Sequence, residues 1–157
     1  MLAYVLDKKI PYTFIDAGCG NGWVVRSVER DTLCKKAIGV DGSKKMIQKA
    51  NKLDPSGSYI CADLMSWIPK KKVDIVHSME VFYYLENPRK IIQQIFNLWL
   101  KKNGSLILVI DFYFENKISH SWPNSCGISK MKLCKQNTYN DVFAEVEKVS
   151  YQLNKLL

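Results

Sequence analysis

The segment from Asp16 to Gly22 places an acidic side chain at the start of a glycine-rich turn, with the sequence Asp-Ala-Gly-Cys-Gly-Asn-Gly. Gly18, Gly20 and Gly22 let the backbone turn sharply and approach a ligand closely. The helix expected after the turn points free N–H groups at the same place, which favours a carboxylate or a phosphate. Because the Asp16 charge would repel a pyrophosphate and suits an ammonium group, the turn indicates a ligand with an ammonium group.

Two further acids follow apolar runs at regular intervals, in Gly39-Val-Asp41 and in Cys61-Ala-Asp63-Leu64. Asp41 can accept hydrogen bonds from both hydroxyls of a ribose. Asp63 can accept from the exocyclic amine of an adenine, and the backbone of Asp63 and Leu64 could complete that edge. Each acid alone could instead form a turn or a helix cap. Ligands of open α/β sheets bind outside the carboxyl ends of the strands, where all three acids would lie.

The elements that position these acids alternate between apolar runs and helical patterns, which predicts an α/β fold with a parallel sheet. The expected strands cover residues 12–17, 37–40, 58–61, 73–78 and 105–111. The expected helices cover residues 23–30, residues 43–53 with Ser43 as cap, and a segment that starts at Asn87-Pro88 and stops at Asn103-Gly104. The strand at 105–111 is almost wholly apolar, so we expect it to be central and buried on both faces.

The C-terminal part has a looser pattern. Residues 112–137 indicate a long loop, and such loops are often functional in compact domains. A short helix near 138–144 and a last strand near 146–153 are expected to complete the chain. With no repeat and no linker, residues 1–157 are expected to form a single domain.

Taken together, these motifs resemble the class I S-adenosylmethionine-dependent methyltransferases, in particular the small-molecule type that includes the ubiquinone and menaquinone methyltransferases. The resemblance covers about residues 10 to 115 and rests on residues 14–22, 39–43 with Met46, 61–64, 73–88 and 103–106. It implies a Rossmann-like, doubly wound, mostly parallel sheet in three layers. It also implies S-adenosylmethionine as cofactor and S-adenosylhomocysteine as product.

The resemblance also implies which residues hold the cofactor. Asp16, Gly18 and Gly20 would hold the methionine end, with Cys19 between them, and the His77 backbone would lie beside the methionine amino group. The remaining members of this set are Asp41 and Gly42 at the ribose, and Asp63, Leu64 and Met46 at the adenine.

The candidates for the acceptor side are Glu80, Tyr83 and His120. Transfer of a methyl group from a sulfonium is an in-line displacement, so the enzyme mainly aligns the acceptor, and a base is needed only if the acceptor must lose a proton. Glu80, Tyr83 and Tyr84 follow the fourth strand and should line the acceptor side, while His120 and Trp122 could close over it. Packing roles for the tyrosines, and a surface position for His120, are the alternatives.

No feature names the acceptor, and a small molecule is the leading class. Nucleic-acid members of the family often carry an Asn/Asp-Pro-Pro-aromatic motif after strand four, where this chain has His77-Ser-Met-Glu80. The alternatives are a degenerate S-adenosylmethionine-binding subunit or sensor, and an RNA methyltransferase supported only by the net charge of +8. An NAD-dependent oxidoreductase is opposed by Asp16 and by a third glycine that comes one residue early for a dinucleotide fingerprint.

The composition bounds the partners. The positive charge is almost all lysine, and the arginines are Arg26, Arg30 and Arg89. Arginine is the residue suited to bidentate phosphate contacts, so a solvated lysine surface is favoured and nucleic acid is not an expected partner. No apolar stretch is long enough for a membrane span or a secretory signal, so a cytoplasmic protein is expected.

Five cysteines without paired spacing argue against a disulfide framework. A metal site from His120, Cys126 and Cys134 can be considered, but zinc sites usually use tighter ligand pairs. Reduced, mostly buried thiols and no metal are therefore expected.

Two departures from the family concern the ends of the chain. Only about ten residues precede the first expected strand, where the family has a helical lid. After the last helix the chain has residues for one strand instead of a closing hairpin, so the final strand of the sheet is expected to be missing. We therefore expect a truncated or minimal form whose sheet edge is either open or paired with another copy in a homodimer.

Overall fold

The computed structural model describes residues 10–128 and 130–155, and side chains up to residue 145. The first nine residues, on which the expectation of a short lead-in rests, lie outside this range. The strands are β1 (Tyr12–Ala17), β2 (Cys34–Asp41), β3 (Tyr59–Cys61), β4 (Val73–Met79) and β5 (Leu100–Val109). The helices are α2 (Trp23–Val28), α3 (Lys44–Leu53), α4 (Pro88–Gln94), α5 (Trp122–Cys126) and α6 (Gln136–Lys155). Short 3₁₀ segments are η1 (Phe82–Tyr84) and η3 (Lys117–Ser121), and η2 (Ile95–Trp99) is a π-helical turn.

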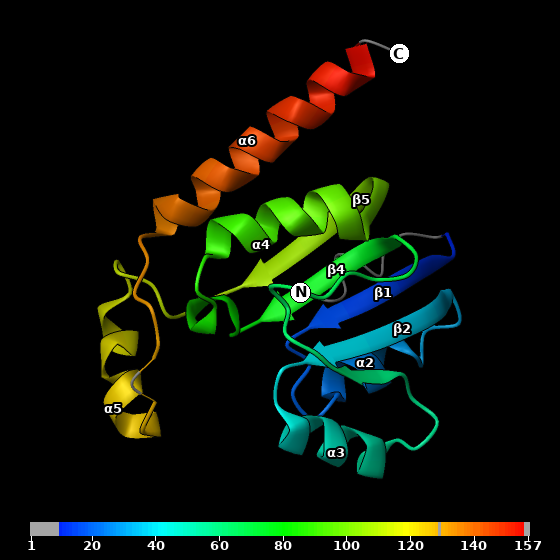
Figure 1. Cartoon of the computed structure of the whole chain (residues 1–157), viewed down its shortest axis with the longest axis horizontal. Helices are drawn as coiled ribbons and strands as arrows, with labels where there is room; N and C mark the ends of the chain where they lie inside the picture. The colour runs from blue at the N-terminus through cyan, green and yellow to red at the C-terminus, as the bar shows by residue number, and fades with distance from the viewer. Residues whose placement is uncertain (1–9, 129, 156–157) are drawn as a thin grey trace.

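The strands form one parallel sheet in the order β3-β2-β1-β4-β5, which confirms the predicted α/β class. The chain starts in the middle at β1, runs outward to β3, and then returns to β4 on the other side of β1 (Figure 1). The register places Asp16 opposite Gly39 of β2 and opposite His77 of β4. This reversal of direction is the position at which open α/β sheets bind ligands.

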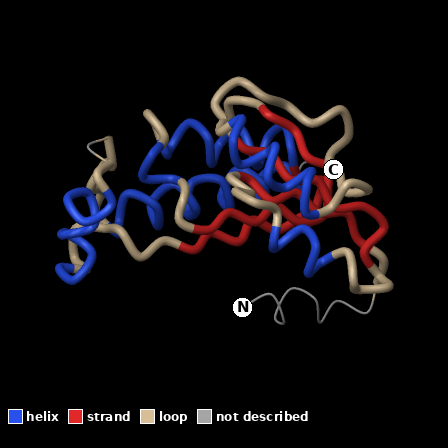
Figure 2. The backbone as a smooth tube through the Cα atoms, turned by 90° about the horizontal axis from the view of Figure 1, so that it is seen from below, coloured by secondary structure: helices blue, strands red, loops and turns tan. Residues whose placement is uncertain are grey.

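Helices pack on both faces of the sheet, which confirms the three-layer, doubly wound arrangement. On one face, buried side chains of α4, η2 and α6 pack against β1, β2 and β4, with Trp99 and Ile91 fully buried. On the other face, Val24, Val25 and Val28 of α2 and Ile47 of α3 pack against β1, β2 and β4. Figure 2 shows η3 and α5 at one end of the molecule, beyond the ends of the strands.

Strand β5 is at an edge of the sheet, so the prediction of a central strand buried on both faces was wrong. Among the described residues it pairs only with β4. Leu106 to Ile110 are all partly exposed. A continuous apolar run indicates a strand with two apolar faces, but it does not reveal how many strands lie beside it.

The strand expected near residues 146–153 was also wrong, because the backbone is helical from Gln136 to Lys155. The single helix α6 replaces the expected short helix and strand, and the described chain therefore holds five strands instead of six. Apolar residues at 139, 142, 143, 146, 149 and 153 follow the helical period. Tyr139 and Val142, at the start of this series, lie in the core, and α6 is in contact with α4.

The predicted helix caps are confirmed, whereas one predicted helix end was wrong. Ser43 accepts a hydrogen bond from the Met46 N–H at 3.4 Å, and Asn87 accepts from the Lys90 N–H at 3.0 Å. The helical segment that follows Asn87 ends at Trp99, before Asn103-Gly104. Asn103 instead lies in β5, with a φ of 65° at a shift of register between β4 and β5.

The segment expected as a loop, residues 112–137, contains the short helices η3 and α5. None of the helices in residues 10–128 and 130–155 is long and apolar enough to cross a membrane.

Candidate active site

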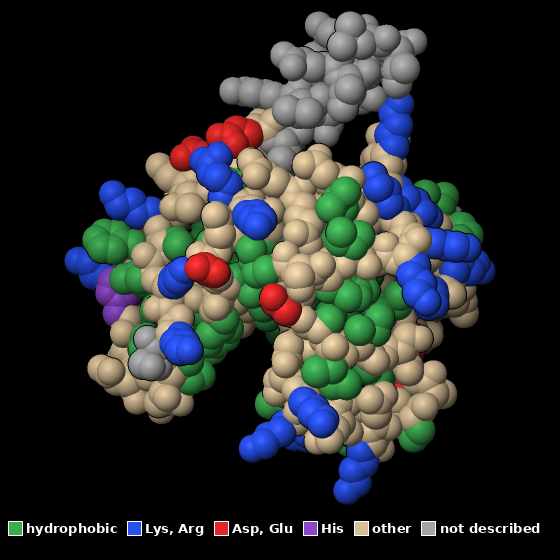
Figure 3. All heavy atoms as spheres, in the orientation of Figure 1, with side chains coloured by type: hydrophobic (Ala, Val, Ile, Leu, Met, Phe, Trp, Pro, Cys, Tyr) green, Lys and Arg blue, Asp and Glu red, His purple; other side chains and the backbone are tan. Residues whose placement is uncertain are grey.

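The sequence-predicted acids gather at the carboxyl ends of neighbouring strands. Asp16 is in β1, Asp41 ends β2, and Asp63 follows β3. The arrowheads of β1, β4 and β5 point toward the side of the molecule that carries α5 (Figure 1). Figure 3 shows the molecule hollowed there, between the lobe of η3 and α5 and the part that carries α3, with hydrophobic side chains along the wall.

The glycine turn is held against β2 by its own backbone. The N–H groups of Gly18 and Cys19 donate to the Val40 carbonyl at 2.7 and 3.1 Å. Gly18 and Gly20 have φ values of +82° and +52°, which favour glycine. A Cβ at Gly18 would collide with the Val81 side chain, whereas a Cβ at Gly20 would meet nothing within 4 Å. Gly18 is therefore required by packing, and Gly20 faces open space that a ligand could fill.

The Asp41 carboxylate connects β2 to the glycine turn. Its Oδ2 accepts a hydrogen bond from the Gly20 N–H at 2.9 Å, and its Oδ1 accepts from the Ser43 N–H at 2.7 Å. A carboxylate can accept about four hydrogen bonds, so each oxygen retains capacity for a further donor. The two hydroxyls of a ribose are donors of the required kind. Gly42, next in the chain, is exposed and leaves the approach open.

Asp16 and His77 form a buried pair across β1 and β4. The His77 Nδ1 lies 2.8 Å from the Asp16 Oδ1, and both side chains are at most 5% exposed. Burial raises the pKa of Asp16, the contact with His77 lowers it, and Asp41 nearby raises it again. The sequence implied a role only for the His77 backbone; the structure shows that its imidazole contacts the acid of the turn.

The residues expected at the adenine lie on the β3 side of the turn. Asp63 is exposed, and its Oδ1 accepts a hydrogen bond from the Met65 N–H at 3.0 Å. This bond forms a local turn, which is the alternative role that the sequence allows for Asp63. Leu64 is buried. Met46 is exposed on α3 and available for contact. Asp41 and Cys61 are in register, so Asp63 and Asp41 leave the sheet close to each other.

The cysteines differ in part from expectation. All are free, but Cys19 is the buried one among them, so "mostly buried" was wrong for the set. Burial, and to a lesser degree the nearby Asp16 and Asp41 carboxylates, raise the pKa of the Cys19 thiol to about 12. The thiol is therefore neutral. Within the described part of the chain, no three His, Cys, Asp or Glu side chains group as metal ligands, and His120, Cys126 and Cys134 do not come together.

Glu80 lies just beyond β4 and is half-buried, with one of its two carboxylate oxygens, Oε2, buried. Its φ of 57° is rare for a residue with a side chain. Its Oε1 accepts from the Asp111 N–H at 2.8 Å, while its buried Oε2 has no hydrogen-bond partner among the described residues. Burial raises the pKa of Glu80, against smaller lowering effects from the Asp111 N–H and the Tyr83 hydroxyl. A strained, under-satisfied carboxylate is a candidate for acceptor chemistry.

An aromatic row runs from η1 toward α5. The rings of Tyr83 and Phe112 lie 5.3 Å apart at a steep angle, and Phe112 stacks with Trp122 at 6.4 Å. Tyr83 is buried. Burial, and to a lesser degree the nearby Glu80 carboxylate, raise the pKa of its hydroxyl, which is therefore neutral. Tyr84 is exposed and lies against Tyr83 at 4.5 Å. Sequence reasoning placed Tyr83 and Trp122 near each other but missed Phe112, which joins them.

His120 is placed differently from Glu80 and Tyr83. It is exposed, its Nε2 lies 3.0 Å from the Phe114 carbonyl, and its ring lies beside the Phe114 ring. No contact with Glu80 or Tyr83 is found within residues 10–128 and 130–145. This position corresponds to the surface alternative for His120.

Val81 and Tyr59 are further site residues that sequence reasoning missed. Val81 fills the space beside Gly18, and Tyr59 fills the space beside Gly22. The Tyr59 hydroxyl donates to Asp54 at 2.9 Å. Their positions in the sequence could have identified them, because Val81 shortly follows β4 and Tyr59 begins β3.

Comparison with known proteins gives the family. The family model described as "Methyltransferase domain" matches residues 15–108. A malonyl-[acyl-carrier protein] O-methyltransferase of Halalkalibacterium halodurans is 30% identical over 119 residues, which are 68% of this chain and 44% of that protein. A trans-aconitate 2-methyltransferase of Rhizobium rhizogenes is 29% identical over 94 residues, or 60% of this chain and 36% of that protein. The chain thus spans less than half the length of these two relatives.

Solved structures agree with this assignment. A putative methyltransferase in complex with the Haloferax volcanii Trm112 methyltransferase activator has a TM-score of 0.79 at 26% identity, covering 92% of this chain and 66% of that one. The plantazolicin methyltransferase BpumL in complex with S-adenosylhomocysteine has a TM-score of 0.60 at 25% identity, covering 68% and 42%. The chain therefore belongs to the methyltransferase domain family, within the class I S-adenosylmethionine-dependent methyltransferases.

Proposed function

We propose that this chain binds S-adenosylmethionine at the carboxyl ends of β1, β2 and β3 and transfers its methyl group to a small-molecule acceptor. The observation that carries the proposal is the link between the Asp41 carboxylate and the Gly20 N–H at 2.9 Å. This link holds Asp41, the acid that we propose as the ribose contact, beside a turn with open space. The buried Asp16 carboxylate, in the neighbouring strand β1, would supply the counter-charge for an ammonium group.

The residues present fit this cofactor. S-adenosylmethionine, when bound, supplies an activated methyl group on a sulfonium. Asp16 would hold its ammonium, Gly18 to Gly20 would admit its methionine end, and Asp41 would accept from its ribose. Asp63, Leu64 and Met46 would border its adenine. An NAD pyrophosphate would meet the negative charge of Asp16 in the same place.

For the acceptor we propose an apolar or aromatic small molecule with a nucleophile that loses a proton. The exposed Tyr84 and the partly exposed Trp122 offer ring faces for stacking, while the buried Tyr83 and Phe112 pack behind them. The Glu80 Oε2 has no hydrogen-bond partner among the described residues, so Glu80 would accept the proton of an acceptor hydroxyl or amine that is brought against it. One relative is named for malonyl-[acyl-carrier protein] and another for trans-aconitate, and the second name supports a small-molecule acceptor.

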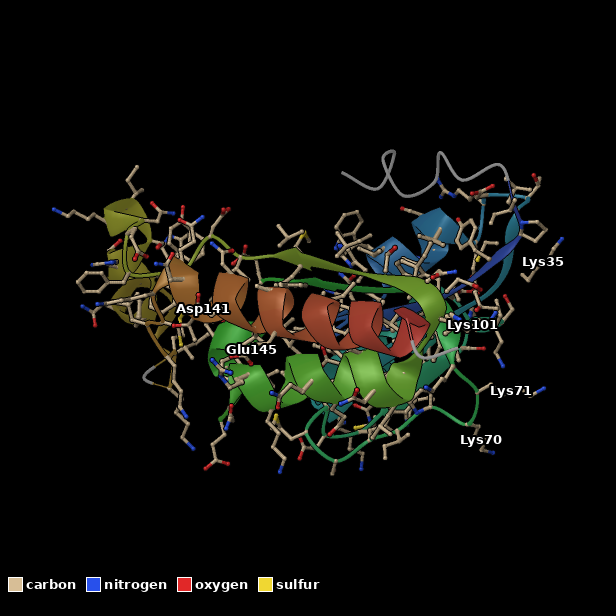
Figure 4. All side chains as sticks on the ribbon, turned by 90° about the horizontal axis from the view of Figure 1, so that it is seen from above. Lys35, Lys70, Lys71, Lys101, Asp141 and Glu145 are labelled. Atoms are coloured by element: carbon tan, nitrogen blue, oxygen red, sulfur yellow. The ribbon has the colours of Figure 1, made fainter. Side chains whose placement is uncertain are left out.

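The alternative of an RNA acceptor is less well supported. Lys35, Lys70, Lys71 and Lys101 lie near one another at one end of the molecule (Figure 4). These residues are at the beginning of β2, before β4 and at the beginning of β5. They therefore lie at the amino ends of the strands, opposite the glycine turn, where RNA bound to them would not reach the methyl group.

Calorimetry with S-adenosylmethionine and with NAD tests the cofactor assignment. We expect micromolar binding of S-adenosylmethionine, about −8 kcal/mol, and none of NAD. NAD binding, or an absence of S-adenosylmethionine binding, would contradict the proposal. RNA binding that falls steeply with added salt would favour the RNA alternative.

A methyl-transfer screen against a metabolite extract, followed by mass spectrometry, tests activity. A new methylated species that forms only with S-adenosylmethionine is the expected result. If the chain binds the cofactor tightly but methylates nothing, the alternative of a cofactor-binding subunit or sensor is favoured.

We further propose that the outer edge of β5 pairs with a second copy of the chain. Among the described residues, this edge has no neighbouring strand. Sedimentation equilibrium over a range of concentrations is expected to show a dimer. A monomer at all concentrations would contradict the pairing.

A further inference from the structure

The contact between His77 and Asp16 is specific to the side chains and is built into the sheet. The two residues are partners in the parallel register of β1 and β4. Their side chains point to the same face of the sheet, where the His77 ring stacks on Phe14 with centroids 6.1 Å apart. The Nδ1 to Oδ1 distance is 2.8 Å, and both residues are buried.

The charge state of Asp16 determines which of the two groups donates. An ionised carboxylate can only accept, so the imidazole donates its Nδ1–H. Oδ1 accepts this hydrogen bond, and no hydrogen bond to Oδ2 is found among the described residues. One oxygen is held by the protein and the other is left for a cation.

We infer that the His77 imidazole is a positioning residue for Asp16, which holds that carboxylate ionised and oriented toward the ammonium group of the cofactor. The inference rests on the proposed function and extends it to a side chain for which only a backbone role had been expected. His77 would act through Asp16 without touching the reacting atoms.

The electrostatic setting explains why Asp16 needs such a partner. Burial raises the pKa of Asp16, and the Asp41 carboxylate raises it further. Cys19, the other titratable group beside it, is held as a neutral thiol and adds no charge. His77 is the neighbour that lowers the pKa of Asp16. Without His77, Asp16 would take up a proton more readily and lose its attraction for the ammonium.

Two variants and two ligands separate this role from a structural one. His77→Asn keeps an N–H donor near the position of Nδ1, whereas His77→Leu removes it. S-adenosylhomocysteine carries the ammonium, whereas 5′-methylthioadenosine lacks the whole aminoacyl end. In His77→Leu we expect about tenfold weaker binding of S-adenosylhomocysteine, because a hydrogen bond to a charged group is lost. Binding of 5′-methylthioadenosine should be unchanged, and His77→Asn should restore most of the difference.

The pH profile of binding gives a second readout. Binding of S-adenosylhomocysteine requires ionised Asp16, so affinity falls as the pH drops through the pKa of that acid. Removal of His77 raises this pKa, so the acid limb of the profile moves to higher pH in His77→Leu. The binding of 5′-methylthioadenosine should show no such limb in either protein.

Ser78→Ala is the matched control. Ser78 is the next residue in β4, is fully buried, and donates to the Ala17 carbonyl at 2.6 Å on the opposite face. We expect this variant to lower the melting temperature without changing the ratio of the two affinities. A ratio unchanged in His77→Leu as well, or lowered equally in Ser78→Ala, would overturn the inference. Failure of the unmodified chain to bind either ligand would instead contradict the proposed function.

Discussion

The Asp41 carboxylate accepts a hydrogen bond from the Gly20 N–H at 2.9 Å, and this bond ties the end of β2 to the turn that follows β1. Asp41 also accepts from the Ser43 N–H at 2.7 Å, at the start of α3. One carboxylate thus organises the turn, the helix start and the proposed ribose contact. Its removal should therefore affect ligand binding more than any other single change in β2.

Asp41→Ala is expected to weaken S-adenosylmethionine binding by about 2 to 3 kcal/mol, because hydrogen bonds to a charged group are lost. These are the bonds from the protein N–H groups and the proposed bonds from the ribose hydroxyls. Asp41→Asn keeps one accepting oxygen and should lose less. Calorimetry on the two variants measures the difference. Unchanged affinity in Asp41→Ala would refute the ribose assignment.

Gly18→Ala and Gly20→Ala should behave differently although both positions have positive φ. At Gly18 the new methyl group collides with Val81, so we expect a loss of about 2 to 4 kcal/mol of stability from strain and overpacking. At Gly20 only the backbone strain, about 1 to 2 kcal/mol, applies, but the methyl group enters the proposed cofactor space. Urea denaturation and cofactor titration test this contrast.

Val81→Ala provides the control for the Gly18 prediction. The double variant Gly18→Ala, Val81→Ala should recover part of the stability that Gly18→Ala loses, because the collision is relieved. Simple addition of the two single effects would show that Val81 is not the obstacle.

Glu80→Gln should reduce methyl transfer by roughly 100-fold or more while cofactor affinity is retained, since the loss of a general base has an effect of this size. The amide oxygen can still accept from the Asp111 N–H. The raised pKa of Glu80 places the acid limb of the rate profile at higher pH than for an ordinary glutamate. The rate of S-adenosylhomocysteine production is measured at several pH values, with the metabolite fraction that is methylated in the screen as acceptor. This measurement gives both the fall in rate and the position of the acid limb.

Glu86→Gln serves as the matched control for Glu80, because Glu86 is exposed and follows the same 3₁₀ turn. It should leave the rate and its pH profile unchanged. An equal fall of the rate in both variants would show that Glu80 is not the base.

Asp74 should make the stability of the fold depend on pH. Its carboxylate accepts from the N–H and hydroxyl of Thr13 at 2.8 and 2.7 Å and from Lys101 at 2.8 Å. Burial raises the pKa of Asp74, but these contacts together outweigh burial and lower it. The stabilisation is therefore fully present above the ordinary pKa of an aspartate and is lost as the pH falls through the lowered value.

Asp74→Asn is accordingly expected to lose about 1 kcal/mol at neutral pH, a modest value because the pair is partly exposed and screened. The difference from the unmodified chain should shrink in acid. Urea denaturation at several pH values measures it, with the exposed Asp141→Asn as control. A constant difference at every pH would contradict the assigned ionisation.

The glycine turn and its acids could be predicted because their chemistry is local. Asp16, Gly18 and Gly20 are close in sequence, and the strand before them and the helix after them fix their geometry. The caps at Ser43 and Asn87 were predictable for the same reason. These features need only neighbouring residues to form.

The parts that could not be predicted depend on distant contacts. The imidazole of His77 meets Asp16 only because β4 returns beside β1, 61 residues later. Phe112 joins Tyr83 to Trp122 only in three dimensions. The apolar run of β5 suits a central strand equally well, and its place at the edge is a property of the whole sheet.

The edge position of β5 has a consequence for handling the protein. Leu106 to Ile110 form a continuous apolar segment with high strand propensity, and such a segment at a sheet edge is a template for aggregation. Lys101 and Lys102 precede this segment and Asp111 follows it, so charged residues that oppose aggregation flank it on both sides. Replacement of these charges by apolar residues would make fibrillar or amorphous precipitation the first observable defect, ahead of any loss of fold.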